Sequence, residues 1–111
     1  MKPAATDRGL HVPLETAGQA QPLAGNLASS LGFLLGADLE YYAPLDVDLQ
    51  KPHTRDEIYV VAAGSGTFEA AGETFSFSVG DVLYVPAHVE HRFTKFTEGF
   101  GTWVIFYGPE Y

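Results

Sequence analysis

Cysteine is absent from the 111 residues, which excludes a disulfide framework and any metal site built on thiolates. Basic residues are scarce, because 6 Lys and Arg stand against 14 Asp and Glu and give a formal net charge of −8. Nucleic-acid phosphates require a positive protein face, which a chain this acidic lacks. We therefore expect no nucleic-acid partner. Gly, Asp or Pro interrupts every longer apolar stretch, and the first eight residues lack the apolar segment of a secretion signal. We therefore expect a cytoplasmic protein with no membrane partner.

The apolar content is sufficient for one folded domain. Hydrophobic residues make up 46% of the sequence and aromatic residues 14%, so a core can form and the chain is not expected to be disordered. A length of 111 residues is typical of a single domain.

Short runs of β-branched and aromatic residues alternate with turn residues along most of the chain. The run Ile58–Ala63 leads into Gly64-Ser65-Gly66, and Gly80-Asp81 precedes Val82–Val85. Closely and evenly spaced runs of this kind are typical of an all-β sandwich or barrel. The expected strands are 39–42, 45–50, 58–63, 67–71, 73–79, 82–85, 91–95 and 102–107. Apolar residues alternate with polar ones over 45–50, which predicts a strand whose polar face, Asp48 included, contacts water.

The first third of the chain has a different composition. Residues 1–37 are rich in Gly, Ala and Pro, and they predict an N-terminal arm that is partly irregular. Leucines at 27, 31, 34 and 35 are spaced for a short helix in this arm, with Asn26 as its cap. Residues 38–111 then form the β-barrel domain.

Three side chains suited to metal binding occur near the starts of two expected strands. His53 and Glu57 are four residues apart, so they point to the same side of an extended chain. His91 opens a later strand. Two imidazoles and a carboxylate form a ligand set for divalent metals that leaves coordination positions open. The alternative is a metal-free barrel in which Glu57 forms a salt bridge with Lys51 or Arg55.

The order and spacing of these residues resemble those of the cupins, whose fold is a jelly roll, also called a double-stranded β-helix. The first cupin motif ends with His, three or four residues, Glu, six residues and Gly, which His53, Glu57 and Gly64 match. The second contains Gly, five residues, Pro and a later His, which correspond to Gly80, Pro86 and His91. The resemblance covers about residues 38–107.

This resemblance implies an all-β jelly-roll barrel that holds a divalent metal ion on His53, Glu57 and His91. Iron, manganese, nickel and zinc all suit such a ligand set. The chain departs from the family at three motif positions: Lys51 replaces the first metal histidine, His88 a glycine and Lys95 an asparagine.

Two aromatic residues share the orientation of the metal ligands. Tyr59 follows Glu57 by two residues, and Phe93 follows His91 by two, so both should face the barrel interior. There they would form the core or the walls of a substrate-binding pocket. We expect His88, in a connection between strands, and His11 to lie at the surface.

The resemblance does not select a reaction, because cupins include dioxygenases, isomerases, decarboxylases and binding or sensor domains. One hypothesis is a metal-dependent enzyme, of oxygenase or isomerase type, that acts on a small oxygenated or anionic molecule. The alternative is a non-catalytic module that binds or senses a small molecule. The cations near the two motifs either pair with neighbouring acids or form a positive rim for a carboxylate ligand; they are Lys51, Arg55, Arg92 and Lys95.

Two expected strands, 58–63 and 102–107, are apolar on both faces. A two-layer fold covers only one face of each sheet, so the other face requires a further cover. We expect a homodimer that buries these strands, with the 9–35 segment lying across the partner. The competing arrangement is a monomer whose own arm covers the sheet.

Overall fold

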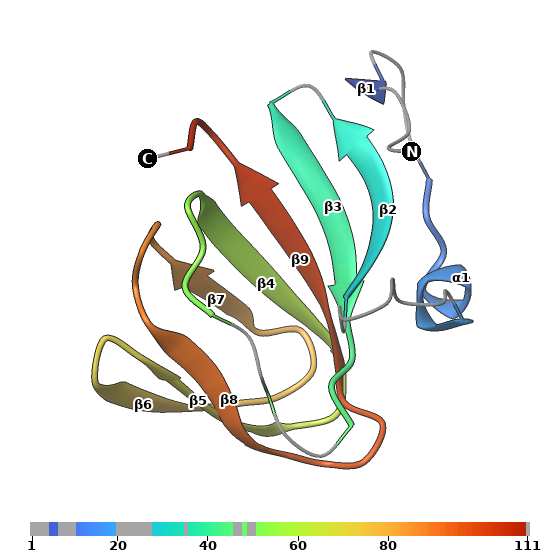
Figure 1. Ribbon diagram of the computed structural model, residues 1–111. Helices are drawn as coiled ribbons and strands as arrows, with labels where there is room; N and C mark the ends of the chain where they lie inside the picture. Colours follow the sequence, from blue (N-terminus) through green and yellow to red (C-terminus); the bar gives the residue numbers. More distant parts are fainter. Residues whose placement is uncertain are drawn as a thin grey trace.

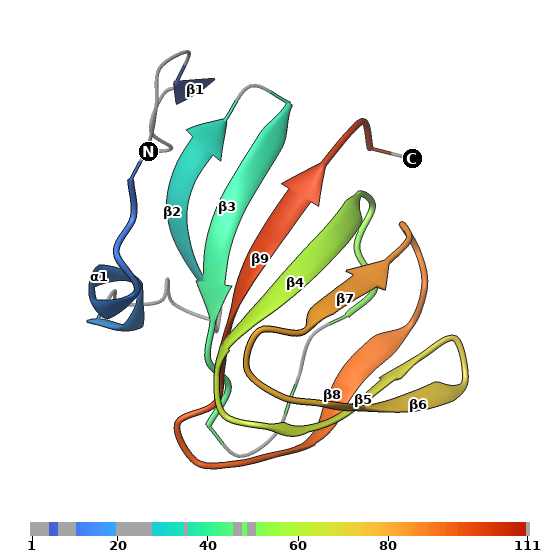
Figure 2. The same ribbon diagram turned by 180° about the vertical axis from the view of Figure 1, so that it is seen from behind.

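Two β-sheets form the body of the protein (Figures 1 and 2). The structure is a computed structural model that describes residues 5–6, 11–19, 28–34, 36–45, 48 and 51–110. One sheet has six strands in the order β1-β2-β3-β9-β4-β7, and the other has three in the order β6-β5-β8. The strands are β1 (Ala5–Thr6), β2 (Ala28–Leu34), β3 (Ala37–Tyr42), β4 (Asp56–Ala63), β5 (Gly66–Ala70), β6 (Glu73–Phe77), β7 (Val82–Val85), β8 (His91–Phe96) and β9 (Gly101–Tyr107), and the helix is α1 (Leu14–Gln19).

Strand β4 lies between β9 and β7 and pairs antiparallel with both. Its side chains alternate, so that Glu57, Tyr59 and Val61 are buried while the residues between them are half-buried. This two-residue period is that of a strand with one face toward the core. The alternation therefore fixes Glu57 on the interior face of the larger sheet.

Aromatic side chains fill the space between the two sheets. The ring of Phe93 lies 4.7 Å from that of Phe68, 4.8 Å from Phe100 and 5.1 Å from Tyr59, measured between centroids. Such tilted and edge-to-face contacts are favourable beyond the apolar area that they bury. The buried core consists of Tyr42, Tyr59, Val61, Phe68, Phe77, Val85, Phe93, Phe100 and Val104. The interior is thus packed with side chains.

The predicted all-β jelly-roll architecture is confirmed, and the predicted turns lie where the sequence places them. Ala71 and Gly72 join β5 to β6, and both have positive φ angles, 51° and 80°. A two-residue hairpin turn of this kind matches the twist of the strands that it connects. Gly64 and Gly80, the glycines of the two motifs, also have positive φ angles, 81° and 92°.

The predicted helix around residues 27–35 is wrong. Residues Ala28–Leu34 form strand β2, which pairs antiparallel with β3, and the short helix lies earlier, at Leu14–Gln19. The register of this pairing shifts between Ser30 and Gly32, where a bulge interrupts the leucine spacing. Hydrogen bonds to β3 outweigh the weak helical pattern, because strand pairing depends on residues that are distant in sequence.

The predicted exposure pattern of residues 45–50 is also wrong at both positions that the structure describes. Leu45 is 85% exposed, whereas Asp48 is 1% exposed. Neither residue belongs to a strand. Positions 46, 47, 49 and 50 lie outside the described residues.

The outward face of the larger sheet is apolar across several strands. Ile58 pairs with Ile105 on β9 and with Tyr84 on β7, and Val60 pairs in the same way with Trp103 and Val82. Val82 and Tyr84 are 63% and 53% exposed. Within the described ranges, no helix has the length and apolar character needed to cross a membrane.

Candidate metal centre

Glu57 is a fully buried carboxylate on the interior face of β4. Its side chain is 1% exposed. Burial of a negative charge is costly unless hydrogen bonds or a cation compensate for it. Both carboxylate oxygens are buried, yet neither has a hydrogen-bond partner within the described part of the chain. A proton or a cation shared with the neighbouring imidazoles would supply this compensation.

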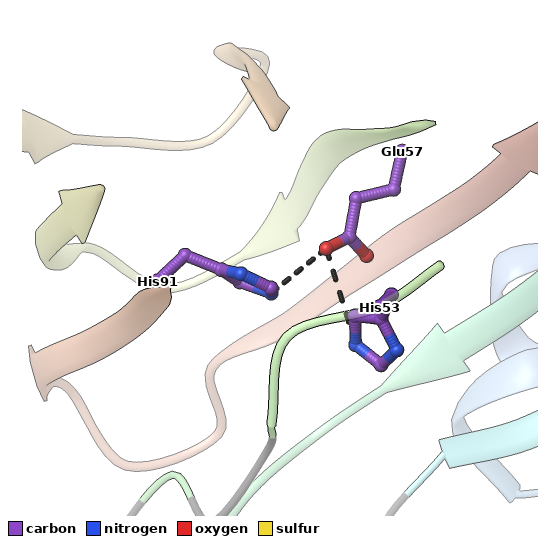
Figure 3. A group of neighbouring side chains, drawn as sticks. All are labelled: His53, Glu57 and His91. Carbon is purple, nitrogen blue, oxygen red and sulfur yellow. Dashed lines mark ion pairs between the residues drawn. The ribbon is translucent and has the colours of Figure 1, made fainter. Parts of the chain in front are cut away.

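His91 approaches Glu57 from the opposite sheet, at the start of β8 (Figure 3). Its Nε2 lies 2.7 Å from Oε1 of Glu57. The Nδ1 nitrogen lies 2.8 Å from the carbonyl oxygen of Val89. Because a carbonyl only accepts hydrogen bonds, Nδ1 carries a proton, and in the neutral ring Nε2 presents a lone pair to Glu57. Two lone pairs at this distance repel, so the pair requires a proton or a cation.

His53 completes the group from the loop that precedes β4. Its Nε2 lies 3.9 Å from Oε1 of Glu57, and its ring lies 5.4 Å from the His91 ring. The side chain is 34% exposed, so it forms the open side of the cluster. The backbone N–H of His88 donates to the His53 carbonyl oxygen at 2.7 Å, and the ring packs edge-on against Phe106 at 5.0 Å. These contacts hold the loop against the barrel.

The three side chains suit a metal ion. One nitrogen or oxygen atom from each lies within 4.8 Å of the others. Two ligands of one zinc-like ion are separated by at most about 4.2 Å, twice the usual metal–ligand distance, so the side chains would move slightly closer together to hold one ion. The Nδ1 of His91 is already fixed by Val89, as is usual for a metal-binding histidine. In the part of the chain that the structure describes, two oxygens of Glu57 and one nitrogen of His91 are buried without hydrogen bonds, and these are the atoms that a cation would engage.

The two histidines have shifted pKa values of opposite sign. Burial lowers the pKa of His53, and the charge of Glu57 only partly offsets this effect. Burial is the largest single effect on His91 and acts to lower its pKa, but the Glu57 carboxylate, the Val89 carbonyl and the charge of Asp48 together raise this pKa overall. The negative charge of Asp48 acts to raise the pKa of both rings. The cluster is thus set to hold positive charge between Glu57 and His91.

The structure brings together the three residues that the sequence singles out as ligands. Glu57 pairs with the two histidines instead of Lys51 or Arg55, because Lys51 is exposed and Arg55 pairs with Asp38 at 2.6 Å. The alternative salt bridge is therefore not formed.

Tyr59 and Phe93 face the interior as predicted, at 0% and 1% exposure. Tyr59 packs behind the cluster, with its ring 6.2 Å from that of His91. Both belong to the core, and their contact with a substrate stays a prediction. His11 and His88 are exposed, as expected.

Asp48 is the functional candidate that sequence reasoning missed. It is buried, and its Oδ2 accepts the backbone N–H of Phe93 at 2.8 Å. The alternation of apolar and polar residues over 45–50 predicted that Asp48 would lie on a solvent-exposed face. Only its contact with the backbone of Phe93 in the structure shows that it points inward.

A cavity of about 260 Å³ adjoins the open side of the cluster. The cavity continues along the interior face of the larger sheet. On this face, Phe106 of β9 pairs with Glu57 of β4 on one side and with Asp38 of β3 on the other. Arg55 is fixed at its rim and donates to Gly36, Asp38 and Gly108. The lining residues are Asp38, Glu40, His53, Thr54, Arg55, Phe106 and Glu110.

The fold and the site together define a small β-barrel protein with a His–Glu–His cluster between its sheets. The chain belongs to the cupin domain family, which matches residues 39–104. An uncharacterised protein from Streptomyces coelicolor is 41% identical over 63 residues. That match covers 57% of this chain and 60% of the relative, less than two thirds of its length.

Solved structures share the fold at low sequence identity. A Ralstonia eutropha JMP134 protein proposed to be a mannose-6-phosphate isomerase superimposes with a TM-score of 0.67 at 23% identity, covering 91% of this chain and 100% of that one. A Cupin 2 conserved barrel domain protein from Salinispora arenicola CNS-205 gives a TM-score of 0.63 at 21% identity, with 81% and 88% coverage. These likenesses establish the fold alone.

Proposed function

We propose that this cupin binds a divalent metal ion through His53, Glu57 and His91. The observation that carries the proposal is the buried carboxylate of Glu57, whose oxygens face two imidazoles and have no hydrogen-bond partner among the described residues. Nitrogen and oxygen ligands in this number suit iron, manganese, nickel or zinc. Such an ion would supply Lewis acidity to an oxygen atom of a bound molecule.

The residues around the cavity favour a neutral, hydroxylated ligand over an anion. Three carboxylates line the cavity and Arg55 is the one cation in its described lining. The Arg55 guanidinium is already engaged by Asp38 and by two backbone carbonyls. The lining residues would therefore repel an anionic group, apart from a group that binds the proposed metal ion directly. The volume of about 260 Å³ suits a molecule smaller than most drug-sized ligands.

We propose a metal-dependent enzyme of isomerase or oxygenase type as the first use of this site. Proton transfer would fall to side chains at the cavity, with Glu40 in reach of a ligand held beside His53. The second candidate is a non-catalytic binding or sensing module. It is favoured by the engagement of Asp38 with Arg55, which removes one carboxylate from acid–base work.

The metal content of the purified protein tests the proposal. The protein should be prepared without a metal-affinity column and analysed for bound elements together with His91→Ala and His88→Ala. We expect about one divalent ion per chain in the native protein and in His88→Ala, because His88 is exposed. His91→Ala should lose the ion. Equal metal content in native protein and His91→Ala would refute the assignment.

Ligand binding and turnover separate the two uses of the site. Candidate sugars and small hydroxy compounds are screened for affinity and for conversion in the metal-loaded protein. Conversion that disappears in His91→Ala supports the enzyme. Binding without conversion for every compound that binds supports the sensing module.

We also propose that two copies of the chain pair through the outward face of the larger sheet. The support is the apolar row that joins β3, β9, β4 and β7, including Leu39, Ile105, Ile58 and the exposed Tyr84. Burial of apolar surface at about 25 cal/mol per Å² favours association against its entropic cost. A closed two-fold dimer is the commonest result.

A further inference from the structure

Asp48 is a buried carboxylate that does not belong to the proposed ligand set. It is 1% exposed and lies in the connection between β3 and β4. Its Oδ2 accepts the backbone N–H of Phe93 at 2.8 Å, and its Oδ1 accepts the hydroxyl of Tyr42. Acidic side chains are rarely buried unless they are paired, so the burial of an aspartate outside the ligand set requires a physical explanation.

The contact with Phe93 joins the two segments that carry the histidines. Strand β8 lies at the edge of the three-stranded sheet, so one side of its backbone has no neighbouring strand of that sheet among the described residues. Asp48 accepts an N–H from β8 two residues after His91, and Asp48 itself precedes His53 by five residues. The Asp48 carboxylate therefore holds position 48, five residues before His53, against the strand that begins with His91.

The connection is also held at its other end. The N–H of His88 donates to the His53 carbonyl, and the N–H of Ala87 donates to Oδ1 of Asp56 at 2.8 Å. The position of His53 relative to His91 is thus set by contacts on both sides of His53. Among these contacts, the one through Asp48 adds a buried negative charge.

That charge has a counterpart in the site. A divalent cation held by Glu57 and two neutral imidazoles leaves one buried positive charge uncompensated. Asp48 supplies one further negative charge in the same interior, and its field acts on both histidine rings. Charges that are screened by little water interact more strongly than charges at the protein surface.

We propose that Asp48 is a positioning residue of the metal centre, which ties the His53 connection to β8 and balances the charge of the divalent cation without binding it. The inference rests on the proposed metal binding. Side chains beyond the direct ligands commonly change metal affinity by 10- to 100-fold when they are replaced.

Two variants separate the roles of position and charge. Asp48→Asn keeps the shape and an oxygen that can accept the Phe93 N–H, but it removes the charge. Asp48→Ala removes both. Asp81→Asn is the matched control, because Asp81 is exposed and its Oδ2 also accepts a backbone N–H, that of Ser78 at 2.9 Å. Each metal-free protein is titrated with Co²⁺, and the dissociation constant, the visible absorption spectrum and the melting temperature are recorded.

We expect Asp48→Asn to weaken Co²⁺ binding by about tenfold with an unchanged spectrum. Asp48→Ala should weaken it further and alter the spectrum, since the ligands lose their relative position. Asp81→Asn should match the native protein. An Asp48→Asn affinity equal to that of native protein, or an equal loss in Asp81→Asn, would overturn the inference while leaving metal binding intact. If Asp48→Ala does not fold, the Asp48→Asn affinity decides. Absence of Co²⁺ binding to native protein would overturn both the inference and the proposed function.

Discussion

The Nε2 atom of His91 and the Oε1 atom of Glu57 lie 2.7 Å apart, although their strands belong to different sheets. β8 is part of the smaller sheet, and β4 is part of the larger one. The cluster therefore connects the two layers of the barrel through charge rather than through backbone pairing. Its protonation and its occupation by a cation should both change the stability of the fold.

The stability of the metal-free protein should depend on pH in two ranges. The raised pKa of His91 contributes stability that is fully present below 6.5, its unfolded value, and is lost as pH rises through the folded value. The lowered pKa of His53 acts below 6.5, where stability increases as pH rises through the folded value. Together, the two histidines predict that the stability of the metal-free protein is greatest near pH 6.5.

Thermal unfolding in the presence of a chelator, at a series of pH values from 5 to 8, measures this dependence. In His91→Ala, the decrease on the alkaline side should disappear. With saturating zinc the trend should reverse, because protons compete with the metal for the same nitrogen atoms. A metal-free melting temperature that keeps rising above pH 7 by the same amount in native protein and His91→Ala would contradict the assignment.

Phe93 should contribute to stability without contributing to metal affinity. Replacement by leucine leaves space among Phe68, Phe100 and Tyr59, and we expect the free energy of unfolding to decrease by about 1–2 kcal/mol. Urea denaturation measures the loss. Phe75→Leu is the control, since Phe75 is 44% exposed and should change stability little. A large loss of ligand affinity in a stable Phe93→Leu protein would instead place Phe93 in the binding pocket.

Arg55 should set the geometry of the cavity rim. Its guanidinium donates 3.0 Å and 3.1 Å hydrogen bonds to the Gly108 and Gly36 carbonyls besides its pair with Asp38. Lysine cannot reproduce this planar set of donors, so Arg55→Lys should lower the free energy of unfolding by roughly 1 kcal/mol. The partial exposure of the pair limits the effect. Denaturation of Arg55→Lys beside Arg92→Lys, an exposed position, would show whether the loss is specific.

The outward face of the larger sheet should control assembly. Light scattering at micromolar concentration is expected to give about twice the 12.0 kDa of one chain. Tyr84→Glu should give a monomer, because the residue is 53% exposed in the apolar row. Phe75→Glu, on the other sheet, should remain dimeric. A native mass near that of one chain rejects the proposed dimer.

Much of the barrel could be predicted from local sequence patterns. Gly64 and Gly80 adopt positive φ angles that favour glycine, and a side chain at Gly64 would also meet the backbone of Phe100 at 2.8 Å. Because such backbone requirements favour glycine, they can be recognised from the sequence. The two-residue period of β4 likewise places Glu57 and Tyr59 on one face before any contact is known.

The remaining features depend on contacts between distant parts of the chain. The leucines of residues 28–34 fit a helix as well as a strand until β3 supplies hydrogen bonds. Asp48 looks like a surface residue because its partners, Tyr42 and the backbone of Phe93, lie elsewhere in the sequence. Alternation describes a regular strand, and Asp48 does not belong to one.

The filled interior of the barrel also has a consequence for kinetics. Tyr59, Phe68 and Phe93 close the space behind Glu57 and His91, and His53 is the partly exposed member of the cluster. Among the described residues, the cavity beside His53 is therefore the route by which a molecule would reach and leave the proposed centre. We expect exchange at the proposed centre to be governed by the lifetime of the bonds formed there. Residence time and affinity should therefore change together across a series of related ligands.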